Sequence, residues 1–578
     1  MKNIFVSTGL LCVATLWLGQ GAAIAQPAIT SGPCSLANSS ASPSSGPPSF
    51  ANSSAGPSSG PPSLANSSAS PSSGPPSFAD SSGGLSGSAG GNTAGTGTAQ
   101  NSAGGSDAGP GSSPKRMLDP VKAPSVASTI GGERRGLAPP LDPAFPSTEF
   151  VGSAGQSLIG VPDTPATYPL EKMLWKTCPL LQRARVHVYG WTNPGYNWST
   201  SHKSNIPLSY AIAPRSLQLD QLILRLERVP DTVQTEHWDW GFRFSNLFGI
   251  DYRWTTAQGW NPASSELLKH NKLYGYDPVE CYGLLYLPKI KNGMMLKFGR
   301  YISPPDIEAQ LAPDNYLWSH SLMFTYDCYT HTGLLASIQL NPQWMVQAGI
   351  HAGDDIAPWD KAAIPTGEAY VRWQSKSGSD SFYGGVNSFN NGAFRLGKEI
   401  RRAQELAAAN GTAAPRIPGH DNLQQYNITW SHRFNRRVHM ATEGYFIWQR
   451  NALVGGTVNN GPPHKFLAGT GAGAPITGLA TSWGVVNYLN IKLSKKDYIT
   501  LRPIDYLGDT KGERTGFATA YASWTLGWVH HFNDLLTIRP EIRYEQALNS
   551  HHGVVVKPYD NGTRRRQFTV GFDLIQRF

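Results

Sequence analysis

A chain of 578 residues has room for several domains, but its composition changes along its length, so length alone does not give the domain count. The net charge of +9 is small for this length and is not gathered into basic clusters, which argues against a nucleic-acid-binding surface. After the first residues, no stretch approaches the roughly 18 to 20 continuous apolar residues of a membrane helix. If this chain crosses a membrane, it must do so as a closed barrel, in which every backbone N–H and C=O is paired.

The beginning of the chain has the layout of a secretory signal peptide. Lys2 precedes a mostly apolar run over residues 4–18, and the small residues Ala23 and Ala25 stand directly before Gln26. We therefore expect residues 1–25 to be a signal peptide that is cleaved after Ala25 on export.

Four cysteines remain after the expected cleavage: Cys34, Cys178, Cys281 and Cys328. None has the paired CxxC spacing of a zinc site, so the sequence predicts neither a metal nor a cofactor. Export makes a disulfide possible, and Cys281 with Cys328 is the pairing we consider, because both lie near expected strand ends.

A tandem repeat follows the signal peptide. Residues 35–48, 49–62 and 63–76 are near copies, rich in Ser, Pro, Gly, Ala and Asn, with one Leu or Phe in each. Such a unit cannot bury enough apolar surface to offset the entropy cost of ordering. We expect residues 26–161 to form a disordered tail, acting as a spacer or reaching toward the cell wall, and residues 162–184 to form a periplasmic lead-in. The sequence leaves open whether residues 170–177 plug a periplasmic mouth.

From residue 185 onward, apolar and polar residues alternate in segments of about ten residues, as tilted membrane strands require. The last segment places Phe568, Val570, Phe572, Leu574 and Phe578 on one face and polar residues on the other. A change of phase around Asp220 and Gln221 indicates a β-bulge. Similar alternation recurs at residues 238–245, 294–299, 346–351, 426–431, 438–449, 523–528 and 536–545.

The connections between these segments are of two kinds. Short turns are expected at residues 292–293, 341–342, 435–436, 495–496 and 533–534, and long loops at 390–421, 451–481 and 547–565. Short turns on one side and long loops on the other are typical of an outer-membrane barrel with its long loops outside the cell. The sequence therefore predicts an all-β, antiparallel up-and-down barrel of about 16 strands (14 to 18) over residues 185–578, with the helix-like residues 398–410 in an outer loop.

Charged residues of both signs occupy the polar faces of the expected strands. Arg539, Glu541, Arg543 and Glu545 form a ladder on one side of one strand. Such a ladder is costly in a packed core and natural in a water-filled lumen, so we predict that these four residues line a pore.

A second group of candidate pore residues surrounds Pro304. In one interpretation the loop folds into the lumen, where Asp306 and Glu308 face the basic residues Arg243, Lys297 and Arg300 and create a field that filters solutes. In the other interpretation it is an ordinary surface loop.

Several segments resemble the OmpL-like (β-barrel porin-2) family of outer-membrane porins. They are residues 188–195, the run from Gly299 to Glu308, residues 321–324 and residues 438–445, within a similarity that covers about residues 179–578. Asp306 departs from the glycine expected there. The resemblance implies a diffusion channel in a Gram-negative outer membrane, surrounded by lipid, that passes small hydrophilic solutes. It also implies that barrel-assembly machinery recognises the last strand, which ends in Phe578.

Two other functions remain as alternatives. An adhesin or cell-wall anchor would use the long loops and the tail without a conducting pore. A barrel enzyme could draw on Ser550 and on the histidine pairs at 530–531 and 551–552, but adjacent histidines point to opposite sides of a strand and the sequence identifies no orienting carboxylate. We therefore predict a porin rather than an enzyme.

Overall fold

The computed structural model describes most of the C-terminal two thirds of the chain. The described residues are 145, 159–160, 166–207, 210–260, 273–304, 306–360, 363–390, 406, 409–410, 423–450, 452, 454–455, 476–548, 550–551 and 554–578. The expected signal peptide, the repeats and most of the expected outer-loop helix lie outside these residues.

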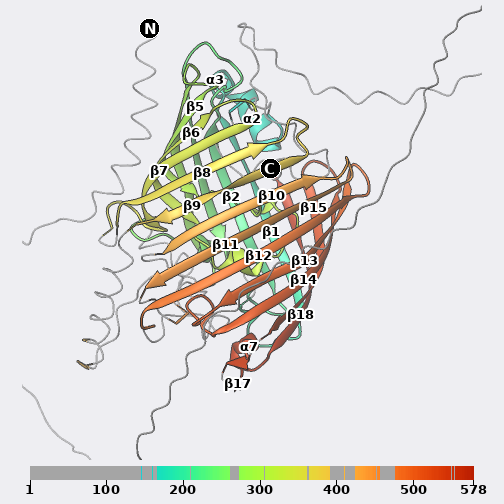
Figure 1. The fold of residues 1–578 in the computed structure, drawn as a ribbon. Coiled ribbons are helices and arrows are strands. Elements are labelled where there is room, and N and C mark those ends of the chain that lie inside the picture. Colours follow the sequence, from blue (N-terminus) through green and yellow to red (C-terminus); the bar gives the residue numbers. More distant parts are fainter. Residues whose placement is uncertain are drawn as a thin grey trace, which may run out of the picture. The chain divides into compact units, whose positions relative to one another are not determined.

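Within the described part of the chain, sixteen strands form one closed antiparallel barrel (Figure 1). The first eight are β1 (His187–Ser199), β2 (Leu217–Arg228), β3 (Asp239–Gly249), β4 (Gly275–Leu287), β5 (Met294–Ile302), β6 (Thr330–Gln339), β7 (Trp344–Asp354) and β8 (Thr366–Gln374). The others are β9 (Asp380–Phe389), β10 (Gln424–Arg433), β11 (Val438–Arg450), β12 (Leu479–Lys492), β13 (Asp497–Asp509), β14 (Thr519–His531), β15 (Leu536–Ala547) and β18 (Arg566–Arg577). Each strand pairs with its neighbours in the chain, and β18 closes the barrel against β1. The predicted fold and strand number are confirmed.

The alternation in the sequence sets which side of each strand faces outward. Apolar side chains such as Phe298, Ile350 and Ile428 lie on the outer surface, with exposed fractions of 53%, 54% and 59%. Their polar neighbours along the same strands point inward and are buried. Large apolar side chains exposed in this way around a barrel are stable in hydrocarbon, so the outer surface is suited to lipid.

The two ends of the barrel differ in their connections. Short turns join β4 to β5, β6 to β7, β10 to β11, β12 to β13 and β14 to β15, as expected. Figure 1 shows α2 (Pro169–Thr177) and α3 (Pro179–Arg183) at this end, whereas α7 (Tyr559–Gly562) and β17 (Val554–Val555), which pairs with β16 (Ser550–His551), lie at the other. The end with short turns is the periplasmic one by the rule for such barrels. No helix among the described residues has the length and apolar content to cross a membrane.

The lead-in packs on the barrel at its periplasmic end. Glu171 of α2 forms an ion pair with His187, at the start of β1, and the ring of Tyr168 lies 5.2 Å from that of Tyr189. His187 and Tyr189 are on the inward-facing side of β1, opposite Val188. The lead-in therefore lies against the inner side of the barrel mouth.

Three residues of the expected tail also pack on the barrel. Phe145 is buried, and its ring meets that of His439 edge-on at a centroid distance of 4.4 Å. Ile159 is buried too, and the backbone N–H of Gly160 donates to the hydroxyl of Thr232 at 3.0 Å. The expected boundary at residue 161 thus assigns to the tail three residues that contact the barrel.

The last strand closes the barrel up to its final residue. The backbone N–H of Phe578 donates to the carbonyl of Gly190 at 2.9 Å, and the N–H of Gly190 donates back at 3.1 Å. A Cβ at Gly190 would meet the Phe578 ring at 2.7 Å and the carbonyl oxygen of Ile223 at 2.1 Å. Only glycine at position 190 lets the terminal ring and the neighbouring strand approach this closely.

The pairing of Cys281 with Cys328 that the sequence left open is not formed. Both cysteines are free. Cys281 lies between the inward-facing residues Glu280 and Tyr282, so its side chain points to the outer surface, whereas Cys328 is buried inside the barrel. The barrel wall separates the two thiols.

Candidate functional site

The connection between β5 and β6 folds into the barrel. We call residues 303–329 the inner segment; it contains the short helices η3 (Ala312–Asp314) and α5 (Leu322–Thr325). Each of its described residues is buried except Pro313 and Asp314, and its side chains pack against inward-facing residues of β11, β12 and β13. The stretch therefore lies inside the barrel and is not a surface loop, although Asp306 and Glu308 are not placed as that interpretation expected.

Polar groups of the inner segment are paired with charged side chains on the wall. The guanidinium of Arg539 on β15 donates to the carbonyl oxygens of Ala312 and Asn315 at 2.8 and 3.0 Å. Arg539 is itself paired with Asp573 on β18, where Nε to Oδ1 is 3.0 Å. Buried backbone groups need such partners, because leaving them unpaired is costly.

The rest of the β15 ladder continues this pattern. A Glu541 carboxylate oxygen accepts from the N–H of Ser319 at 3.0 Å, and Arg543 donates to the carbonyl of His320. Arg543 also pairs with Glu545 at 2.9 Å. All four predicted residues face inward, but they are buried, and three of them bind the inner segment directly.

Two residues of β13 share this role and were not singled out in the sequence. Arg502 donates to the carbonyl of Ser319 at 2.8 Å, and Asp505 accepts from the N–H of Leu322 at 2.8 Å. The signal for Arg502 was the alternation of β13, which places it on the polar face. Asp505 lies within an irregular stretch of the pairing between β13 and β14, between Arg502 and Tyr506, so the alternation does not predict which way its side chain points.

The predicted bulge in β2 also serves the inner segment. The pairing of β2 with β1 skips Asp220, so Asp220 and Gln221 both point into the barrel. Asp220 accepts from the indole N–H of Trp318 at 2.7 Å. Gln221 donates to the carbonyl of Gln310 at 2.9 Å and accepts from the N–H of Ala312 at 3.1 Å. One extra residue in the strand thus supplies two adjacent contacts to the segment.

Asp306 and Glu308 do not face Arg243, Lys297 and Arg300 as expected. The inner segment crosses the barrel, so Glu308 accepts from Tyr488 at 2.7 Å and lies 3.1 Å from the Nδ1 atom of His320.

The two acidic groups lie in opposite electrostatic environments. Asp306 lies with Asp327 and Glu443, and one carboxylate oxygen from each of the three lies within 4.8 Å of the other two. Burial and these two carboxyl groups raise the pKa of Asp306 well above its usual range. Although burial opposes ionisation, hydrogen bonding and charge from His320 hold the pKa of Glu308 at about 2.

The basic residues lie on the wall formed by β2 to β5. Arg243 forms ion pairs with Glu227 at 2.7 Å and Glu280 at 3.4 Å, and Arg225 pairs with Glu280 at 3.0 Å. Lys297 lies over the ring of Tyr282, with Nζ 4.9 Å from its centroid. The side chain of Arg243 remains 16% exposed, so this group of charges of both signs is not completely buried.

Arg300 is separate from this group. Its guanidinium is fully buried, forms two hydrogen bonds to Asp277 at 2.9 and 3.0 Å, and donates to the backbone carbonyls of Thr255 and Pro278. These contacts fasten the loop between β3 and β4 to the wall.

Of the histidines considered for an enzyme, His531 lies 2.9 Å from the hydroxyl of Thr537, and His530 lies beside a carboxylate. His530 lies 2.7 Å from Asp497, but the hydroxyl of Ser494 donates to that same carboxylate and not to the histidine. A serine hydrolase needs its hydroxyl bonded to the base. The side chains of Ser550 and His551 lie outside the described residues.

Comparisons with known proteins bear on the family. No curated protein matches the chain. Among solved structures, the anion-selective porin from Comamonas acidovorans is similar, with 9% identity, a TM-score of 0.41, and coverage of 68% of this chain and 99% of that one. OprB of Pseudomonas putida has 11% identity, a TM-score of 0.39, and coverage of 70% and 97%. Values this low carry no argument about function.

The decisive match is to a family model that spans the entire barrel. The model described as "Putative beta-barrel porin-2, OmpL-like" matches residues 185–578. This range contains all sixteen strands, the inner segment and the charged wall that holds it. The chain therefore belongs to the OmpL-like family of β-barrel porins and is an outer-membrane porin.

Proposed function

We propose that this porin lets small hydrophilic solutes diffuse passively through the barrel, and that the inner segment narrows their path. The observation that carries the proposal is the placement of residues 303–329 inside a closed sixteen-stranded wall. A barrel of this size encloses an aqueous channel when its interior is free. A segment held across it reduces the cross-section and excludes large solutes.

We infer that the path passes the group of charges around Arg243 on β3. Arg243 bonds to Glu227 and Glu280 and keeps part of its side chain exposed, whereas Arg539 and Arg543 on β15 bind the inner segment. Paired charges of both signs along a narrow passage favour hydrated, polar solutes over apolar ones.

Planar-bilayer recording of the purified full chain tests this function. Passive diffusion predicts discrete, persistent current steps and, in liposome-swelling assays, rates that fall with the size of uncharged sugars. A folded barrel that leaves the bilayer sealed would contradict the proposal and favour an adhesin or anchor. Folding is checked in the same preparation by the heat-dependent shift in electrophoretic mobility that stable barrels show.

A further inference from the structure

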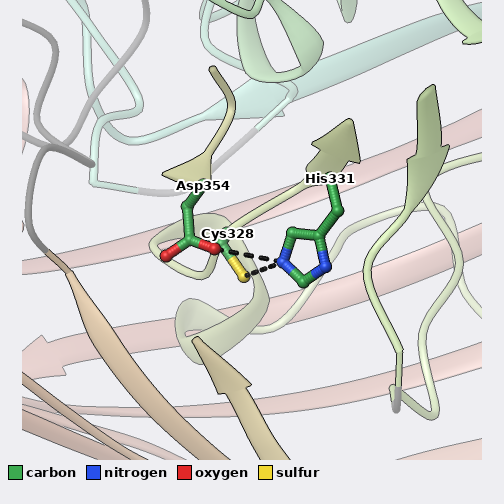
Figure 2. A group of neighbouring side chains, drawn as sticks. All are labelled: Cys328, His331 and Asp354. Carbon is green, nitrogen blue, oxygen red and sulfur yellow. Dashed lines mark hydrogen bonds and ion pairs between the residues drawn. The ribbon is translucent and has the colours of Figure 1, made fainter. Parts of the chain in front are cut away.

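Three side chains from separate parts of the barrel converge near its extracellular end (Figure 2). Cys328 comes from the end of the inner segment, His331 from β6 and Asp354 from the last position of β7. The Nε2 atom of His331 lies 3.8 Å from the sulfur of Cys328 and 3.0 Å from Oδ1 of Asp354. All three residues are buried.

We propose that Cys328, His331 and Asp354 bind a zinc ion. Thiolate, imidazole and carboxylate are the three kinds of ligand that zinc takes in proteins. With Zn–S of about 2.3 Å and Zn–N and Zn–O of about 2.0–2.1 Å, tetrahedral geometry separates sulfur from nitrogen by about 3.6 Å and nitrogen from oxygen by about 3.3 Å. The observed distances of 3.8 and 3.0 Å are close to these values, and the ligand atoms of all three residues lie within 4.8 Å of one another, so shifts of the side chains bring all three to one ion. The fourth position is left to water.

A second layer of contacts orients the histidine for this role. The Nδ1 atom of His331 lies 3.0 Å from Oε2 of Glu368, and that carboxylate accepts hydrogen bonds from Tyr301 and Tyr370. A proton held on Nδ1 by a carboxylate leaves the Nε2 lone pair free for a metal, as in most zinc-histidine sites. The side-chain amide of Asn387 donates to the sulfur of Cys328 at 3.5 Å and fixes its position.

His351 closes one side of the site without being needed as a ligand. Its ring is stacked on that of His331 at a centroid distance of 3.8 Å, and its Nε2 atom lies 3.2 Å from the carbonyl oxygen of Asn387. The stacking fixes the orientation of the His331 ring, so that its Nε2 atom points toward Cys328 and Asp354.

The ion would join the end of the inner segment to two neighbouring wall strands. Cys328 belongs to the segment, whereas His331 and Asp354 are residues that pair with each other across β6 and β7. Zinc binding here does not depend on whether the barrel conducts, so it is tested by measuring metal rather than current.

The experiment uses the full chain in detergent micelles, stripped of metal by a chelator and dialysed against limiting Zn²⁺ or Co²⁺. We expect the wild type to bind one ion per chain at this site and Cys328→Ser to lose that ion. The cobalt form of Cys328→Ser should also lack the near-ultraviolet absorption of cobalt bound to a thiolate. Cys281→Ser is the matched control, because it removes a thiol from the outer surface, and it should keep both the ion and the absorption. Glu368→Gln should weaken binding by about 10–100-fold.

The result that would overturn the proposal is equal metal content in the wild type and in Cys328→Ser, or no thiolate absorption from the cobalt form of the wild type. Heat-dependent electrophoretic mobility establishes that each variant is a folded barrel. If Cys328→Ser does not fold, Glu368→Gln provides the second comparison, and an unchanged affinity there counts against the site.

Discussion

Replacing Arg539 with methionine tests whether the charged face of β15 holds the inner segment in place. The Arg539 guanidinium donates to the carbonyl oxygens of Ala312 and Asn315 at 2.8 and 3.0 Å. A hydrogen bond to a charged group contributes about 1.5–3 kcal/mol, so loss of both bonds removes about 3–6 kcal/mol from the attachment of the segment. Since about 1.4 kcal/mol changes an equilibrium constant tenfold, the equilibrium constant for local opening around η3 rises by about 100-fold to 10,000-fold.

Hydrogen–deuterium exchange of the folded protein in micelles measures this opening. We expect the protection of residues 309–319 to fall by at least about 100-fold in Arg539→Met, while the strand amides keep theirs. Arg243→Met is the matched control, because it also removes a guanidinium from the inner wall, but one that is bonded to Glu227 and Glu280. The proposed role of Arg539 is refuted if the protection of residues 309–319 is unchanged in Arg539→Met, or if the control lowers it equally.

Three further predictions concern charge, pH and assembly. Glu308→Gln removes a carboxylate whose pKa is about 2 and should shift the reversal potential in a salt gradient away from cation preference, whereas Asp306→Asn, at a group whose pKa is raised, should not; an unchanged potential with Glu308→Gln would remove that residue from the filter. Burial raises the pKa of Asp327 to about 6. Packing of the inner segment is therefore favoured below this pH and weakened as the carboxyl group ionises above it. Protection of the segment from hydrogen exchange should fall as the pH rises through that range in the wild type and not in Asp327→Asn. Deletion of Phe578 removes the backbone pair with Gly190 and should lower the yield of heat-modifiable barrel in the outer membrane, whereas an undiminished yield would show that assembly does not depend on the terminal residue.

The barrel was predictable because its strands obey a period of two. Lipid on one side and a polar interior on the other force alternation, so the pattern of residues alone assigns Phe572 and Asp573 to opposite faces of the last strand. The same rule placed Arg539 and Glu541 inside. The sequence left the pairing of Cys281 with Cys328 open because proximity to strand ends says nothing about which side of the wall each thiol occupies.

The contacts of the inner segment could not be predicted in the same way. A loop has no period, and the partners of Asp306 include Glu443, which lies more than a hundred residues further along the chain on β11. The expectation that Asp306 and Glu308 face the basic residues of β3 and β5 assumed a short loop that stays near its own strands. The segment crosses the barrel instead, because the wall opposite offers partners for its backbone, among them Arg539 and Arg502.

The most direct test of the account compares single-channel currents of the full chain with those of a variant in which a short glycine-serine linker replaces residues 306–327. An inner segment that narrows a diffusion pore predicts discrete steps from both proteins, with a larger unit conductance and a larger solute size limit for the variant. Equal conductance and equal size limits in two correctly folded barrels would contradict it.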